Sequence, residues 1–258
     1  MDDFKNIAKN IKTSIDNLKS NKNSEEKSKD KTNENSTDTS VTIIEDCCED
    51  ITAGENGDFW FNIELRKTHN KQSKIDKNYN GKTIVIVLES PHKDEFKDSN
   101  FISPALGTTG RMLQTYFTDE NLNKLLGKEY LCNNYRVILM NSIQYQCSLG
   151  APTEKYCDCI WFTTWYNEGK DSFTNRIKSY DPDIIINLST KRKLTEEKVN
   201  IINQAINSSN TISQTDTICK IVSDEINNYI KTANKRVISY TGYHPSGWAP
   251  NFDSIHLS

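Results

Sequence analysis

The sequence is short of the apolar residues that a fully packed chain of its length needs. Apolar residues make up 35% of the 258 residues and aromatic residues 9%, below the share in a typical globular protein. At roughly 100–200 residues per domain, the chain has room for one full domain and an appendage. The deficit lies mostly at the front, so we expect one folded core behind a polar segment.

Signals for membrane insertion and export are also missing. No apolar run reaches the roughly 18 residues of a membrane span, and residues 1–5, MDDFK, do not have the basic and then apolar composition of a signal peptide. We therefore expect a cytoplasmic protein with no membrane partner. Seven cysteines, an odd number in such a chain, favour reduced thiols over a disulfide framework.

The sequence has no excess of basic residues. Residues 1–50 contain 8 Lys and Arg against 12 Asp and Glu, and the remaining residues contain 24 against 23. A protein that holds DNA mainly through phosphate charge usually has a basic excess or stripe. The balance argues against a large non-specific footprint and leaves room for a small local contact.

Nucleotide-binding loops and internal repeats are absent from the sequence too. No strand-like segment is followed by a Walker-type loop or by G-x-G-x-x-G. Nucleotide hydrolysis and dinucleotide binding therefore lose their usual support.

Residues 1–50 form the polar segment. Apolar side chains at helical spacing in residues 4–19 predict a short amphipathic helix. Residues 20–40 contain no large apolar side chain and predict a disordered linker. We interpret the helix as a marginal element of a flexible tail, and binding of a protein partner by this N-terminal tail is the alternative.

The remainder, residues 51–258, has the pattern of one α/β domain. Short β-branched apolar segments predict buried parallel strands at residues 83–88, 136–141, 183–188 and 236–241. Segments with helical spacing lie between them, at residues 107–126, 171–180, 195–206 and 217–233. Alternation of strands and helices implies right-handed crossovers. We predict an open three-layer sandwich with a central four-stranded parallel sheet.

Polar loop residues follow all four predicted strands. Ligands of open α/β sheets bind beyond the carboxyl ends of the strands, so these residues mark the expected site. The four strand ends are Glu89-Ser90-Pro91-His92-Lys93, Asn141-Ser142, Ser189-Thr190 and Gly242-Tyr243-His244-Pro245-Ser246.

A dense aromatic segment follows the second predicted strand and contains Trp161, Phe162, Trp165 and Tyr166. Such rings could stack on unpaired bases. Packing in the core is the favoured interpretation.

The strand ends, in this order, resemble the motifs of the uracil-DNA glycosylase superfamily. Residues 88–92, LESPH, are similar to Gly-Glu-Ala-Pro-Gly of its iron–sulfur branch, and residues 104–113, PALGTTGRML, to that branch's Pro-Phe-Val-Gly-x-x-Gly-x-Leu-Leu. Residues 139–143, LMNSI, resemble a strand that ends in Thr-Asn-Val-Val, and residues 244–246 match the family's His-Pro-Ser. The similarity covers about residues 80–250.

The resemblance implies cleavage of an N-glycosidic bond in DNA, with a role for each matching residue. His244 would stabilise the oxygen of the departing base, where negative charge develops. Asn141 would read the polar edge of the base, because an amide offers both donor and acceptor. Glu89 or Ser90 would lie near the sugar. The family's water-positioning aspartate corresponds to Ser90, so either Glu89 is the carboxylate or water is positioned differently.

Thr108 and Thr109 open a Gly-flanked helix, and together with Ser246 they are candidates for binding phosphate. A helix N-terminus presents free N–H groups to such an anion. Helix capping by threonine is the alternative interpretation, and the two roles are compatible.

The sequence departs from the family where a base would be held. The aromatic residue that stacks on the flipped base corresponds to Ala105, so Phe101 or His92 would have to replace it. His92 also stands in place of the tyrosine that excludes thymine. Selectivity for uracil therefore does not follow from the resemblance.

The iron–sulfur branch binds its cluster through four cysteines. Cys147 and Cys157 stand near the places of the later two, and Cys159 lies close by. The adjacent pair Cys47 and Cys48 cannot easily supply two well-placed ligands. We therefore expect no cofactor and free thiols, with an iron–sulfur cluster as the alternative.

The expected function is that of a DNA glycosylase-like hydrolase that flips uracil or another modified base into a pocket at the strand ends. The alternative is a non-catalytic nucleic-acid or nucleotide sensor on the same fold. The near-neutral charge of residues 51–258 and the missing stacking ring favour this alternative.

Overall fold

The computed structural model describes residues 59–62, 82–91, 108–116, 135–144, 147, 157–206 and 209–247. The predicted tail of residues 1–50, with its short helix and linker, lies outside these residues. All four predicted strands lie inside them.

The described strands form one sheet in the order β1-β3-β2-β4-β5. They are β1 (Phe59–Asn62), β2 (Lys82–Leu88), β3 (Tyr135–Asn141), β4 (Ile184–Asn187) and β5 (Ile238–Thr241). The neighbours β3, β2, β4 and β5 are all parallel, which confirms the predicted four-stranded parallel sheet. The sequence pattern does not predict β1, which pairs antiparallel with β3 at the edge.

The central strands owe their composition to burial on both faces. Ile84, Val85, Ile86 and Val87 of β2 are fully buried, and the isoleucines of β4 are buried as well. A parallel strand covered on both faces has no polar side to show, so its sequence is a continuous apolar run. This explains why these strands are readable from the sequence.

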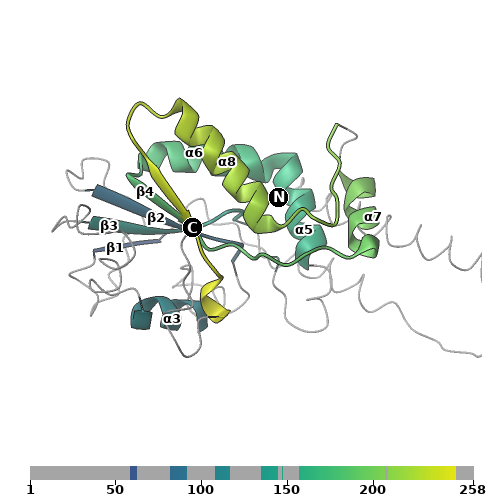
Figure 1. Cartoon of the computed structure of the whole chain (residues 1–258), viewed down its shortest axis with the longest axis horizontal. Coiled ribbons are helices and arrows are strands. Elements are labelled where there is room, and N and C mark those ends of the chain that lie inside the picture. The colour runs from purple at the N-terminus through teal and green to yellow at the C-terminus, as the bar shows by residue number, and fades with distance from the viewer. Residues whose placement is uncertain are drawn as a thin grey trace, which may run out of the picture.

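Helices cover both faces of the sheet, which confirms the three-layer arrangement. In Figure 1, α3 and the yellow coil of η6 lie below the strands, α6 and α8 lie above them, and α5 and α7 lie to their right. Their bounds are α3 (Thr108–Tyr116), α5 (Cys157–Thr164), η5 (Trp165–Gly169), α6 (Lys170–Tyr180), α7 (Glu196–Ala205), α8 (Ile218–Thr232) and η6 (Pro245–Gly247). None of the described helices has the length and apolar character needed to cross a membrane.

The two helices nearest the sheet pack through one apolar stripe each. Phe173 and Ile177 of α6 are four residues apart and fully buried, as are Val222 and Ile226 of α8. This spacing places each pair on one helical face. The helical segments 171–180, 195–206 and 217–233 predicted from that spacing are confirmed as α6, α7 and α8.

The aromatic segment 161–166 belongs to the core. Trp161 and Trp165 stack at 5.1 Å between ring centroids, and Phe162 meets Trp161 edge-on at the same distance. All three side chains are buried. These rings of α5 and η5 therefore pack in the core, as the favoured interpretation of this segment predicts.

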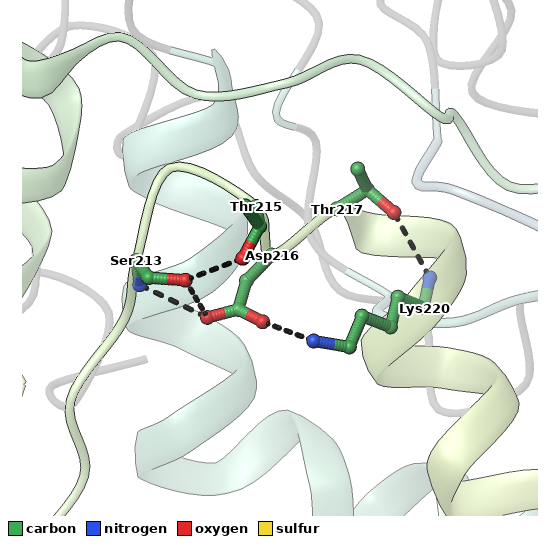
Figure 2. Close-up of polar contacts among 5 residues, drawn as sticks. All are labelled: Ser213, Thr215, Asp216, Thr217 and Lys220. Carbon is green, nitrogen blue, oxygen red and sulfur yellow. Dashed lines mark hydrogen bonds and ion pairs between the residues drawn. The ribbon is translucent and has the colours of Figure 1, made fainter.

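The loop before α8 is fixed by the polar network of Figure 2. Thr217 caps the helix by accepting a hydrogen bond from the Lys220 backbone N–H at 3.1 Å. Asp216 accepts from the Ser213 backbone N–H at 2.9 Å and pairs with Lys220 Nζ at 2.7 Å. Ser213 also lies 2.9 Å from the Thr215 hydroxyl. This network sets where α8 begins, beside the loop that leaves β4.

Candidate functional site

The ends of the four parallel strands meet at one edge of the sheet, which we call the carboxyl edge. Hydrogen bonding continues past the strands, from Ser142 N to Leu88 O at 2.8 Å and from Gly242 N to Asn187 O at 2.9 Å. The loops therefore start in fixed positions. Along this edge the strand order places Asn141 next to Glu89, then Thr190, then the loop with His244.

Glu89 lies at the centre of the carboxyl edge, directly after β2. Its Oε2 accepts a hydrogen bond from the Thr190 hydroxyl after β4. Burial raises the pKa of the Glu89 carboxyl, and the nearby Asp158 carboxylate also raises it, while Thr190, Arg192 and Lys198 oppose the rise. The net shift brings this group closer to exchanging a proton near neutral pH.

The backbone of Glu89 is held as firmly as its side chain. Its carbonyl accepts hydrogen bonds from the Ser142 hydroxyl and from Trp161 Nε1, the latter at 3.2 Å. Trp161 Nε1 also lies 3.0 Å from the Ser142 hydroxyl oxygen. The buried indole therefore fixes the start of the loop that carries the Glu89 carboxyl group.

Asn141 ends β3 with a side chain that is 3% exposed. Its Oδ1 atom has no hydrogen-bond partner among the residues that the structure describes. Leaving a buried acceptor unpaired costs about 1–3 kcal/mol, so such an atom calls for a physical reason. An acceptor reserved for a ligand at the carboxyl edge is such a reason.

The backbone at Asn141 is fixed by a guanidinium group from α6. Arg176 Nη2 donates to Asn141 O at 2.9 Å and to Ser142 O at 3.1 Å. These carbonyls lie at the end of β3, where the ladder with β2 runs out. Arg176 therefore acts as a positioning residue for Asn141.

His244 follows β5 and is partly buried. Its Nδ1 accepts a hydrogen bond from the Ser246 backbone N–H at 3.3 Å and lies 2.8 Å from the Ser246 hydroxyl. A backbone N–H can only donate, so the ring proton resides on Nε2. Burial lowers the pKa of His244 to about 4. The ring is therefore neutral at physiological pH and presents Nε2–H as its donor.

The candidate phosphate residues, Thr108, Thr109 and Ser246, lie on the face of the sheet that α3 and η6 cover. Thr108 is exposed and Thr109 partly exposed in the first turn of α3, which packs against η6 next to His244 (Figure 1). The Ser246 hydroxyl is engaged with His244 Nδ1. Ser246 thus contacts the imidazole of His244. Because Ser246 is also exposed, it remains accessible to a ligand.

The remaining predicted site residues divide into two groups. Ser90 is partly buried beside Cys147, within hydrogen-bonding reach of the thiol. His92 and Phe101, the two candidates for holding a base, lie outside the described residues, as do Cys47 and Cys48. The structure therefore places Glu89, Asn141 and His244 along one edge, with Thr190 between Glu89 and the His244 loop, and positions 92 and 101 lie outside the described residues.

The sequence pattern names Thr190 and Trp161, but it does not predict that they contact Glu89, and it does not name Arg176. Thr190, Trp161 and Arg176 hold Glu89 and Asn141, and the buried Asp158 pairs with Lys198 near Glu89. Thr190 carries a signal, since it lies at the end of a predicted strand. Arg176 carries none, because a lone arginine on a helix is usually a surface residue.

The described cysteines do not form a site for an iron–sulfur cluster, which needs four thiolates. Cys147, Cys157 and Cys159 are buried, and no disulfide joins them within the described residues. Burial raises the pKa of Cys147 well above its usual range and that of Cys159 to about 12. Within the described ranges, no three His, Cys, Asp or Glu side chains gather as metal ligands.

Comparisons of the chain with models of protein families, with curated proteins and with solved structures find no match. The functional conclusion therefore rests on the chemistry of the carboxyl edge and on the motif resemblance.

Proposed function

We propose that this chain is a DNA glycosylase-like hydrolase that cleaves the N-glycosidic bond of uracil or another modified base flipped out of DNA. The observation that carries the proposal is the presence of three complementary groups along one edge: the Glu89 carboxyl, the Asn141 amide oxygen without a partner among the described residues, and the neutral imidazole of His244. Each matches one need of this reaction.

The base needs recognition and its departure needs stabilisation. Asn141 Oδ1 would accept a hydrogen bond from a ring N–H of the base. His244 Nε2–H would donate to a base oxygen, where the negative charge of the departing base accumulates. A neutral donor suits this role, because its hydrogen bond strengthens as the charge develops while the proton stays on the ring.

The sugar needs a water molecule. Its oxygen forms a bond to the anomeric carbon, the bond from that carbon to the base nitrogen breaks, and the bonding electrons leave with the base. Glu89, in its carboxylate form, would take the proton released by the water. Thr190 holds one oxygen of this carboxyl in place, and the raised pKa of Glu89 suits proton transfer near neutral pH.

The motif resemblance supports the same roles independently of the geometry. The segments similar to the uracil-DNA glycosylase superfamily come in order along the chain, and three of them end at the carboxyl edge. The fourth opens α3, which packs against η6.

The test is release of a base from DNA. Single- and double-stranded oligonucleotides that carry uracil or other modified bases are incubated with the protein, and abasic sites are detected by alkaline cleavage. We expect abasic product from at least one base. Measurable binding with no product from any base would favour the non-catalytic sensor instead.

A further inference from the structure

Three consecutive basic residues lie in the loop after β4, beside the carboxyl edge. Lys191, Arg192 and Lys193 are all exposed, and the preceding Thr190 donates to Glu89. Arg192 is close enough to influence the pKa of Glu89. No ion pair joins any of the three cations to another residue in the described part of the chain. Residues 51–258 contain 24 basic and 23 acidic residues and are nearly neutral. The three cations therefore form a local positive patch beside the candidate site.

An exposed ring stands next to these cations. Tyr243 precedes His244 and is 51% exposed, and it is the one exposed large hydrophobic side chain among the described residues. Lys191 Nζ lies 4.9 Å from the centre of its ring. The loops after β4 and β5 therefore join into one surface of Lys191, Arg192, Lys193 and Tyr243, which we call the basic-aromatic rim.

The acidic residues that follow along the chain have a local role of their own. Glu196 and Glu197 lie in the first turn of α7, where carboxylates stabilise the helix dipole. Thr195 caps the same helix. The helix start accounts for these acids, whereas none of the three exposed cations has an ion-pair partner among the described residues.

We propose that the basic-aromatic rim binds single-stranded DNA, with phosphates on the cations and a base stacked on Tyr243. The placement rests on the proposed function, because the rim borders Glu89 and His244 and would hold the nucleotides beside the one whose base is cleaved. Cations interleaved with aromatic rings are typical of single-strand binding. A base inside a duplex is already stacked on its neighbours, and a duplex would require a longer basic stripe than these three cations form.

The experiment measures binding of a fluorescent single-stranded oligonucleotide without any modified base, by anisotropy over a range of salt concentrations. The test protein is a triple variant, Lys191→Ala with Arg192→Ala and Lys193→Ala. The matched control is Lys178→Ala with Lys231→Ala and Arg236→Ala, which removes the same charge from exposed positions around the opposite edge. Circular dichroism verifies that each variant is folded.

We expect the rim triple variant to bind about tenfold more weakly at low salt. Each lost phosphate contact should also reduce the slope of log affinity against log salt concentration by about 0.7. Tyr243→Ala should weaken binding about tenfold with the slope unchanged, and Tyr243→Phe should retain affinity, because stacking needs only the ring. Equal binding by the rim and control triple variants, no binding at all, or tighter binding to duplex DNA or RNA would overturn the proposal.

The design separates this inference from the proposed function. Binding through the rim without base release from any substrate would support the binding role of the rim and refute the hydrolase. Base release with the same KM in the wild type and the rim triple variant would support the hydrolase and refute the binding role of the rim.

Discussion

At the scale of single residues, the carboxyl edge holds groups in states that folding alone would avoid. Glu89 is a partly buried carboxyl group with a raised pKa, Asn141 has a buried acceptor without a described partner, and His244 is kept neutral. Local rules of this kind are broken mainly where function demands it. These residues therefore allow stability and activity to be separated by substitution.

Glu89→Gln should remove activity while stabilising the fold at neutral pH. The folded-state pKa of Glu89 is raised above 4.5, so the wild type loses stability as pH rises through the unfolded-state pKa toward the folded one. Glutamine cannot ionise and keeps an acceptor for Thr190. Urea denaturation should show the variant more stable than the wild type at neutral pH and equal to it below pH 4.5. Base release should fall about 100-fold or more.

A variant that is less stable than the wild type at neutral pH would contradict the buried state assigned to Glu89. Retained base release would contradict its catalytic role.

Asn141→Leu should be nearly neutral for stability and remove base recognition. An apolar side chain of similar size replaces a buried acceptor that has no partner among the described residues, so little is lost on folding. The matched control is Asn187→Leu, at the end of β4. Asn187 donates to Cys219 O and Ser223 Oγ and accepts from Ser189 N, so its loss should cost about 2 kcal/mol or more. Thermal denaturation of both variants decides, and equal losses would show that Asn141 is paired.

At the scale of elements, the sequence predicts the strands and helices whose periodicity is unmixed. β2 and β4 are continuous β-branched runs, and α6 and α8 have single apolar stripes. β1 is a four-residue segment, FWFN, without a β-branched residue. α5 is buried on every side, so it has no stripe to read. Both are defined by tertiary packing rather than by local pattern.

The site follows the same division. Glu89, Asn141 and His244 could be chosen as candidate site residues because strand ends mark ligand sites in open sheets. The hydrogen bond between Thr190 and Glu89 joins residues 101 positions apart, and the Arg176 contact with Asn141 spans 35. Such contacts depend on the packing of whole layers, which the sequence pattern does not specify.

The start of α8 offers a test of the network in Figure 2. Burial raises the pKa of Asp216, but hydrogen bonds from Lys220 and Ser213 outweigh it and lower the pKa below 3.8. Asp216 therefore contributes stability above pH 3.8 that is lost as pH falls through the folded-state pKa. Asp216→Asn should cost about 1 kcal/mol at neutral pH and nothing at strongly acidic pH, measured by urea denaturation.

Asp224→Asn is the control for this substitution, because it removes the same charge from an exposed position on α8. A loss of stability at Asp224 equal to that at Asp216 would mean that net charge, rather than the network, stabilises the helix start.

Gly169 tests how the π-helical turn η5 packs under the loop after β3. A Cβ atom at this position would lie 2.7 Å from Ile143 Cγ2 and 3.2 Å from the Thr164 carbonyl oxygen. Gly169→Ala should therefore cost about 1–3 kcal/mol. In a double-mutant cycle, Ile143→Ala removes the clashing methyl group and should relieve part of that cost. Strict additivity of the two changes would argue against this contact.

At the scale of the whole molecule, one sheet edge unites the groups of the proposed chemistry and the basic-aromatic rim. The parallel strands bring four distant loops to this edge, with α3 and η6 on one face and the larger helical layer on the other (Figure 1). The helical layer supplies Trp161 and Arg176, which hold Glu89 and Asn141 in place. The fold therefore acts as a support for a candidate site built mostly from loops.

The most direct measurement is base release by the wild type and by His244→Ala on oligonucleotides with uracil or other modified bases, combined with binding of the same oligonucleotides. We predict abasic product from the wild type, a rate about 100-fold or more lower in the variant, and nearly unchanged binding. Absence of product from every base, or an equal loss of binding and rate in His244→Ala, would contradict the assignment of His244 as the group that stabilises the departing base.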